Sequence, residues 1–137
     1  MKISIETVVK APISTVWGSW ITPEDITSWN FASDEWCCPK AEVNLHVGEK
    51  FSYRMEAKDG SMGFDFEGTF IKVSLHESIH FELEDNRIVT VEFLETNDGV
   101  KVVETFEAED ENPAEQQKQG WQSILNNFKK HVENKGN

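Results

Sequence analysis

The chain has 137 residues, 38% hydrophobic and 11% aromatic, which predicts a single globular domain over residues 1–137 with a substantial core. Its net charge of −12 and its pI near 4.7 repel phosphate backbones, which excludes nucleic acid as an expected partner. Because no apolar run approaches the ~20 residues that span a bilayer and no signal-peptide core precedes the first strand, we expect no membrane insertion and a cytoplasmic location.

The first forty residues predict one strand, two short helices and a loop. Alternating apolar residues from Ile3 to Val9 indicate the strand. The apolar residues between Ile13 and Ile21 then share one helical face. Thr22 is expected to cap a second helix, with Pro23 in its first turn and its end near Trp29. Residues 30–36 follow as a loop.

Six more strands are predicted in quick succession, joined by short turns. Their expected ranges are 42–47, 51–56, 64–75, 79–83, 89–93 and 100–107. The sequences Asp59-Gly60 and Asn97-Asp98-Gly99 are typical of hairpin turns. The apolar side changes parity near 68–70, which predicts a bulge. The pattern indicates an α+β fold with a curved antiparallel sheet of about seven strands.

A long helix is predicted to close the chain. Asn112 and Pro113 form its start, as N-cap and first residue, and it continues to Val132. One apolar stripe runs along it, made by Trp121, Ile124, Leu125, Phe128 and Val132. We therefore expect this helix to pack on the sheet. Gly120 is unfavourable inside a helix and is expected where the helix comes close to the sheet or to a ligand.

Several motifs resemble a known family. They are Ala11-Pro12 before Val16-Trp17, Thr22-Pro23-Glu24 before Trp29, Val47-Gly48-Glu49-Lys50-Phe51 before Tyr53-Arg54-Met55, and Gly120-Trp121 before Leu125 and Phe128. Together with the order of elements, they resemble the START-like (SRPBCC) superfamily, and within it the bacterial branch of the family named for the activator of the heat-shock-protein-90 ATPase. The chain departs from that family at Glu49, where a second glycine is frequent, and at Cys37, where bacterial relatives tend to carry histidine.

The resemblance implies a helix-grip (START/Bet v-like) fold with a cavity beneath the long helix. START-like proteins bind lipids, polyketides, hormones or flavonoids there, and some are cyclases or hydrolases. We expect Trp121, Ile124 and Phe128 as the lid of the cavity and aromatic residues of the sheet as its floor. The candidate ligand-binding residues are Trp17, Trp20, Trp29, Phe31, Trp36, Tyr53, Met55, Phe64, Phe66, Phe81, Val91, Phe93, Glu104, Trp121, Ile124 and Phe128. The alternative for each aromatic residue is plain core packing.

Glu104 is the candidate catalytic residue. It shares its side of the strand with Val102 and Phe106, so an inward orientation would place it in an apolar site with a raised pKa. The alternative is an outward Glu104, with Val103 and Thr105 inward. The pattern leaves both orientations open.

No cofactor and no metal site are expected. The four histidines, His46, His76, His80 and His131, lack metal-ligand spacing and are expected at the surface. Cys37 and Cys38 are neighbours, so we expect two reduced thiols on a strand, one inward and one outward.

Three functions follow from these observations, in order of preference. The first is binding of a small apolar, ring-containing molecule. The second is an enzyme of the cyclase or hydrolase kind that uses Glu104 as general acid or base. The third is a co-chaperone-like domain that contacts a chaperone through an exposed apolar patch. The ligand and the oligomeric state stay open.

Overall fold

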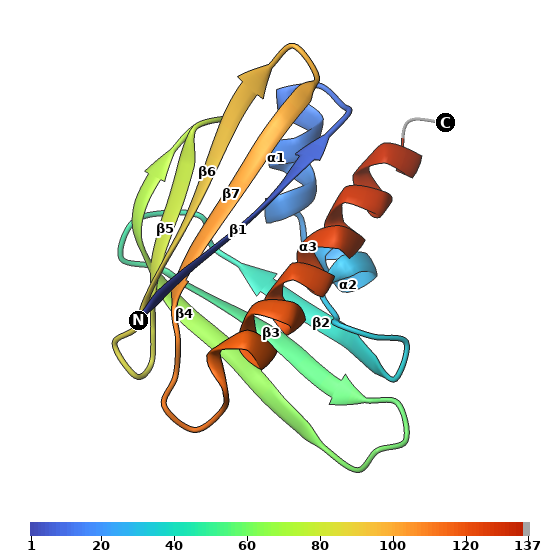
Figure 1. Cartoon of the computed structure of the whole chain (residues 1–137), viewed down its shortest axis with the longest axis vertical. Coiled ribbons are helices and arrows are strands. Elements are labelled where there is room, and N and C mark those ends of the chain that lie inside the picture. The colour runs from blue at the N-terminus through green and yellow to red at the C-terminus, as the bar shows by residue number, and fades with distance from the viewer. Residues whose placement is uncertain (136–137) are drawn as a thin grey trace.

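A strongly curved sheet of seven antiparallel strands wraps around one long helix, and two short helices close one end (Figure 1). The computed structural model describes residues 1–135. The strands are β1 (Lys2–Val9), β2 (Trp36–Val43), β3 (Lys50–Ala57), β4 (Gly63–Ser74), β5 (Ser78–Leu83), β6 (Ile88–Thr96) and β7 (Gly99–Glu107). The helices are α1 (Ile13–Ile21), α2 (Pro23–Trp29) and α3 (Ala114–Lys135). This architecture confirms the predicted α+β helix-grip fold.

The strand order in the sheet is β1-β7-β6-β5-β4-β3-β2. The first strand therefore pairs with the last one, and β2 lies at the opposite edge. The prediction of a strand over 42–47 is wrong, because β2 spans Trp36–Val43. Pro39 has no N–H to donate, and the pairing of β2 with β3 shifts between Cys37 and Lys40, which hides the strand's alternation. Cys38 is buried and Cys37 is half-buried, as expected for neighbours on a strand.

The predicted bulge lies in β4, where the pairing with β5 shifts between Phe70 and Lys72. It exposes Ile71 while Phe70 stays buried. The β6–β7 turn requires Gly99, because its φ is +137° and a Cβ there would collide with the carbonyl oxygen of Val9.

The two short helices are locked to each other by a buried indole. Trp29 on α2 donates from Nε1 to the carbonyl oxygen of Ser19 on α1 at 3.0 Å. Thr22 occupies the predicted N-cap position of α2, with Pro23 next to it, but its side chain makes no capping hydrogen bond. The predicted position is therefore correct, and the predicted hydrogen bond is absent.

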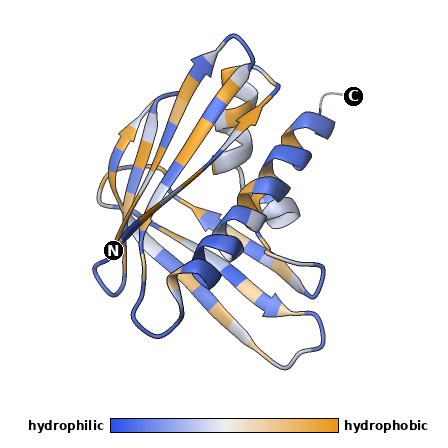
Figure 2. Ribbon diagram, in the orientation of Figure 1, coloured by the Kyte–Doolittle hydropathy of each residue, from blue (hydrophilic) through white to orange (hydrophobic). Residues whose placement is uncertain are grey.

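The long helix α3 has two different halves. It begins at Ala114, one residue later than predicted. In its C-terminal half Leu125, Phe128 and Val132 are buried, whereas Trp121 and Ile124 in the N-terminal half are only half-buried. Most of the helix surface turned away from the sheet is hydrophilic (Figure 2). The predicted stripe therefore exists, but only one half of it is fully packed.

Polar contacts fix the C-terminal half of α3 in place. The Lys129 ammonium donates to the carbonyl oxygen of Val8 on β1 at 2.6 Å. His131 and Asp25 of α2 form a hydrogen bond of 2.8 Å, and Lys135 donates to the same carboxylate at 2.9 Å. The N-terminal half is joined to β1 by a longer bond of 3.3 Å, from Gln122 to the Glu6 carbonyl oxygen.

Among residues 1–135, no helix has the length and apolar character that crossing a bilayer requires. Over the same residues, no group of three or more His, Cys, Asp or Glu side chains is placed to hold a metal ion.

Candidate functional site

A cavity of about 450 Å³ lies between the N-terminal half of α3 and the curved sheet. Its walls come from α1, α2, the strands β3 to β5, β7 and the loop before α3. The lining residues are Trp20, Trp29, Asn30, Ala32, Tyr53, Met55, Phe64, Phe66, Phe81, Arg87, Glu104, Glu109, Asn112, Gln116, Gln117, Gly120, Trp121 and Ile124.

Ring contacts hold the aromatic walls in fixed orientations. Trp121 stacks on Phe106, with ring centroids 4.1 Å apart and planes inclined by 9°. Trp121 also contacts the Phe66 ring edge-on, with ring centroids 6.1 Å apart. At the other end of the cavity, Trp20 and Trp29 lie 5.0 Å apart. Aromatic rings in such arrangements contribute stability beyond their buried area, so these contacts help to hold the walls in place.

Glu104 points into this cavity, which is the inward one of the two orientations that the sequence left open. It lies on β7 between Ile5 of β1 and Val91 of β6, and it is only 7% exposed. Burial raises its pKa from 4.5 to about 8. Among residues 1–135, no side chain or backbone group hydrogen-bonds to its carboxyl group. At neutral pH this group is therefore largely protonated.

Two more polar groups lie deep in the cavity. The amide of Asn30, which is 7% exposed, donates to the sulfur of Met55 at 3.4 Å and to that of Cys38 at 3.9 Å. Burial raises the pKa of Tyr53, and the nearby Cys38 and Glu104 raise it further. The Tyr53 phenol is thus a neutral hydrogen-bonding group. The interior combines apolar rings with a few hydrogen-bonding groups, as ligand cavities commonly do.

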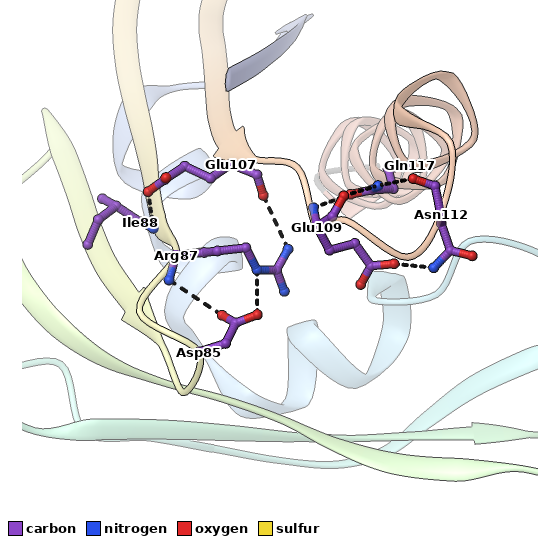
Figure 3. Close-up of polar contacts among 7 residues, drawn as sticks. All are labelled: Asp85, Arg87, Ile88, Glu107, Glu109, Asn112 and Gln117. Atoms are coloured by element: carbon purple, nitrogen blue, oxygen red, sulfur yellow. Dashed lines mark hydrogen bonds and ion pairs between the residues drawn. The ribbon is translucent and has the colours of Figure 1, made fainter. Parts of the chain in front are cut away.

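The mouth of the cavity is polar and internally bonded (Figure 3). The Arg87 guanidinium donates to the Asp85 carboxylate at 2.7 Å and to the carbonyl oxygen of Glu107 at 3.1 Å. In the loop before α3, the Gln117 amide accepts from the Glu109 N–H at 2.9 Å and donates to its carbonyl oxygen at 3.1 Å. The Asn112 amide donates to the Glu109 carboxylate. These bonds fix the rim.

Ten of the predicted ligand-binding residues line the cavity, and six lie outside it. Those outside are Trp17, Phe31, Trp36, Val91, Phe93 and Phe128. Phe128 does not belong to the lid, because it is buried between Trp20 and Trp29 at ring distances of 4.9 and 5.0 Å. Phe93 does not belong to the floor, because it packs against the rings of Trp17 and Trp20 in the core.

Of the other four residues outside the cavity, Trp17, Trp36 and Val91 pack against neighbouring side chains, and Phe31 lies at the surface. Trp17 contacts His76 as well as Phe93, and Val91 is fully buried on β6. Trp36 packs edge-on against Phe64 at 6.0 Å. Phe31 lines a separate surface groove next to the C-terminal half of α3.

The prediction of the site from the sequence was based on aromatic residues, so it missed most of the polar residues that line the cavity. The residues missed are Asn30, Ala32, Arg87, Glu109, Asn112, Gln116, Gln117 and Gly120. Gly120 carried a signal, as a glycine inside a helix, but of its two predicted reasons the close approach to the sheet is absent: a Cβ at this position would meet no protein atom within 4 Å. Its missing side chain instead leaves room in the cavity.

Two histidines have acidic partners that the sequence did not indicate. His131 bonds to Asp25, and His80 bonds to Glu92 across neighbouring strands at 2.8 Å. Burial alone would raise the pKa of Asp25, but hydrogen bonds from Lys135 and His131 outweigh it and lower that pKa. Both pairs lie outside the cavity.

Comparison with known proteins identifies relatives over almost the entire chain. The solved structure of an AHSA1-like protein from Aeromonas hydrophila is 46% identical, with a TM-score of 0.93 over 99% of this chain and 94% of that one. A protein from Cytophaga hutchinsonii is 43% identical, with a TM-score of 0.85 over 98% and 93%. One from Nitrosomonas europaea shares the fold at 15% identity, with a TM-score of 0.85 over 98% and 96%.

No curated protein matches the chain. The family model described as activator of Hsp90 ATPase homolog 1-like protein matches residues 10–133. This match covers most of the sequence and agrees with the START-like resemblance of its motifs. The chain therefore belongs to the activator of Hsp90 ATPase homolog 1-like family.

Proposed function

We propose that this protein binds a small hydrophobic, ring-containing molecule in the cavity between the sheet and α3. The observation that carries the proposal is the volume of about 450 Å³ walled by seven aromatic lining residues. Ligand pockets are typically about 300–1,000 Å³ and mostly apolar, with a few polar groups that orient the guest. Glu104, Tyr53 and Asn30 are such groups here.

The construction of α3 supports a binding role. Its C-terminal half is buried and bonded to β1 and α2, so it holds the helix on the sheet. Its N-terminal half contributes the apolar side chains of Trp121 and Ile124 to the cavity wall, with Gly120, Gln116 and Gln117 beside them. The C-terminal half thus anchors α3, while the N-terminal half lies over volume that its own side chains do not fill.

A matched pair of leucine substitutions tests the proposal. Gly120→Leu adds a side chain where a Cβ meets open space at the cavity wall, whereas Gln119→Leu adds one at an exposed position of the same helix. Thermal unfolding is measured with a panel of ring-containing apolar compounds and a matched polar panel. At a concentration of about 100 times Kd, a guest that binds only the folded state stabilises it by about 2.7 kcal/mol.

We expect stabilisation by apolar ring compounds for the unmodified chain and for Gln119→Leu, and its loss in Gly120→Leu. Native mass spectrometry of the protein as purified is expected to reveal a guest by its added mass. The absence of stabilisation by any ring compound, together with a bare mass, would refute the proposal.

Acid–base catalysis is the second candidate function, because Glu104 lies in the cavity with a pKa raised to about 8. A carboxyl group with a pKa near the working pH is suited to proton transfer. Glu104→Gln is expected to retain binding of neutral ring compounds and to abolish turnover if the protein is an enzyme. The chaperone-contact hypothesis has no such specific support. The exposed large apolar residues are Met1, Val47, Met62, Phe64, Ile71, Leu75 and Leu94.

A further inference from the structure

The unpartnered carboxyl group of Glu104 restricts the chemistry of the guest. Buried polar side chains are almost always hydrogen-bonded, and buried carboxylates are almost always paired with a cation. The Glu104 side chain is only 7% exposed, and no group of residues 1–135 hydrogen-bonds to its carboxyl group. It also reaches the cavity surface. Whatever fills the cavity beside this carboxyl group is therefore its hydrogen-bonding partner, and a guest with a complementary polar group would supply one.

The residues around Glu104 supply no cation that could pair with it in the interior. Its strand neighbours are Ile5 on β1 and Val91 on β6. The Tyr53 phenol on β3 lies near Glu104, and the Cys38 thiol on β2, whose pKa is raised by burial, lies near Tyr53. Neither the phenol nor the thiol carries a positive charge, and the pKa of Glu104 is raised by burial.

The helices and the rim contribute no free positive charge either. The cavity-lining residues of α1, α2 and α3 have no ionisable side chains; they are Trp20, Trp29, Gln116, Gln117, Gly120, Trp121 and Ile124. At the rim, the Arg87 charge is balanced by Asp85 at 2.7 Å, and Glu109 adds a carboxylate. The rim is therefore net negative.

Two guest chemistries satisfy Glu104, and the surroundings favour one. A neutral carbonyl or hydroxyl would accept or donate one hydrogen bond at a protonated Glu104. A protonated amine would form an ion pair with the ionised group, and the faces of Trp20, Trp29, Tyr53 and Trp121 would add cation–π attraction. The net charge of −12 also attracts cations to the protein.

We propose that the cavity selects an organic cation, a ring-containing amine whose ammonium group binds the Glu104 carboxylate while its rings contact the aromatic walls. This inference rests on the proposed function, since it names the class of molecule that the cavity holds. It also gives Glu104 a role in specificity, as the group that distinguishes an amine from an uncharged molecule of the same shape.

Three probes with one ring system and different charge test the inference. They are naphthylmethylamine, which is cationic, naphthylmethanol, which is neutral, and naphthoate, which is anionic. Their affinities for the full chain are measured by isothermal titration calorimetry at a series of pH values. We expect the amine to bind at least about tenfold more tightly than the alcohol at about pH 8, and the naphthoate to bind least, because an ion pair forms only with the amine.

The pH dependence provides a readout that needs no substitution. The amine requires ionised Glu104, so its affinity is expected to rise about tenfold between about pH 6 and pH 7 and to level off above about pH 8. Proton release on binding accompanies this rise. A neutral guest that accepts a hydrogen bond from protonated Glu104 has the opposite trend, with weaker binding at high pH.

Glu104→Gln is expected to reduce the affinity for the amine at least about tenfold and that for the alcohol less than about threefold. Glu95→Gln, at an exposed position on β6, is the control and should change neither. If the alcohol binds as tightly as the amine, or the affinity for the amine falls as the pH rises, the inference is overturned while the cavity remains a binding site. If no probe binds, both this inference and the proposed function fail.

Discussion

Replacement of Glu104 by glutamine is expected to stabilise the protein, and the gain should grow with pH. The side chain is 7% exposed and its pKa is raised from 4.5 to about 8 by burial. The folded state therefore keeps a proton that the unfolded state releases above about pH 4.5. The contribution of this group to stability is fully present below that pH and is lost as the pH rises through the folded-state pKa.

The size of the effect follows from this pKa difference. Each unit corresponds to about 1.4 kcal/mol. Between about pH 5 and pH 8, the folded chain is expected to lose about 3–4 kcal/mol of unfolding free energy through Glu104 alone. Glutamine has nearly the same shape and does not ionise, so Glu104→Gln removes this loss.

Urea unfolding followed by tryptophan fluorescence measures the difference at each pH. Other ionisable groups, such as Asp25, whose pKa is lowered, titrate in both proteins and cancel when the two curves are subtracted. We expect the difference curve to rise with pH by the amount given above, while Glu95→Gln stays level with the original chain. A flat difference curve for Glu104→Gln between about pH 5 and pH 8 would show that the carboxyl group is solvated, and would refute the reasoning.

Three further predictions concern the helices. Gly120→Ala is expected to raise the unfolding free energy by about 1 kcal/mol, because a methyl group there meets no atom within 4 Å and alanine favours the helix; chemical denaturation measures it. Leu125→Ala should cost about 3 kcal/mol and Ile124→Ala distinctly less in the same assay, since the first opens a void in packed core and the second only enlarges an existing cavity. Asp25→Asn and His131→Ala should each cost about 1–3 kcal/mol near neutral pH, with a positive coupling in a double-mutant cycle. Because the pKa of Asp25 is lowered, the loss caused by Asp25→Asn should vanish as the pH falls through that pKa; equal losses at low and neutral pH would contradict the assignment.

Local patterns were sufficient for most elements and failed where the backbone is irregular. Alternation located β5 and β7 to within one residue and β6 to within three, because their inner faces are buried and their outer faces are half-buried or exposed. It misplaced β2, because Pro39 and a register shift break the period there. It also located the bulge of β4 only approximately. A change in which side of the strand carries the apolar residues indicates an inserted residue, but it does not show where the pairing with β5 shifts.

The site was less accessible to sequence reasoning than the fold. Aromatic residues on the right strands were identified, but core and cavity use the same residue types, so Phe93 and Phe128 could not be separated from Phe66 and Phe81. Only the distance between helix and sheet decides this, and that distance depends on contacts such as His131 with Asp25, which lie 106 residues apart.

The sequence by itself determined the order of elements, the α+β class and the family, because hydrophobic period, turn residues and short motifs are local properties of the chain. The tertiary structure alone decided the direction of Glu104, the extent of the cavity and the residues of its polar rim. On β7 both sides of the strand are apolar near its middle, so the pairing of Glu104 with Ile5 and Val91 beneath α3 was needed to bury the carboxyl group. The cavity exists because α3 is packed tightly along its C-terminal half only, and no local pattern records where a helix leaves space.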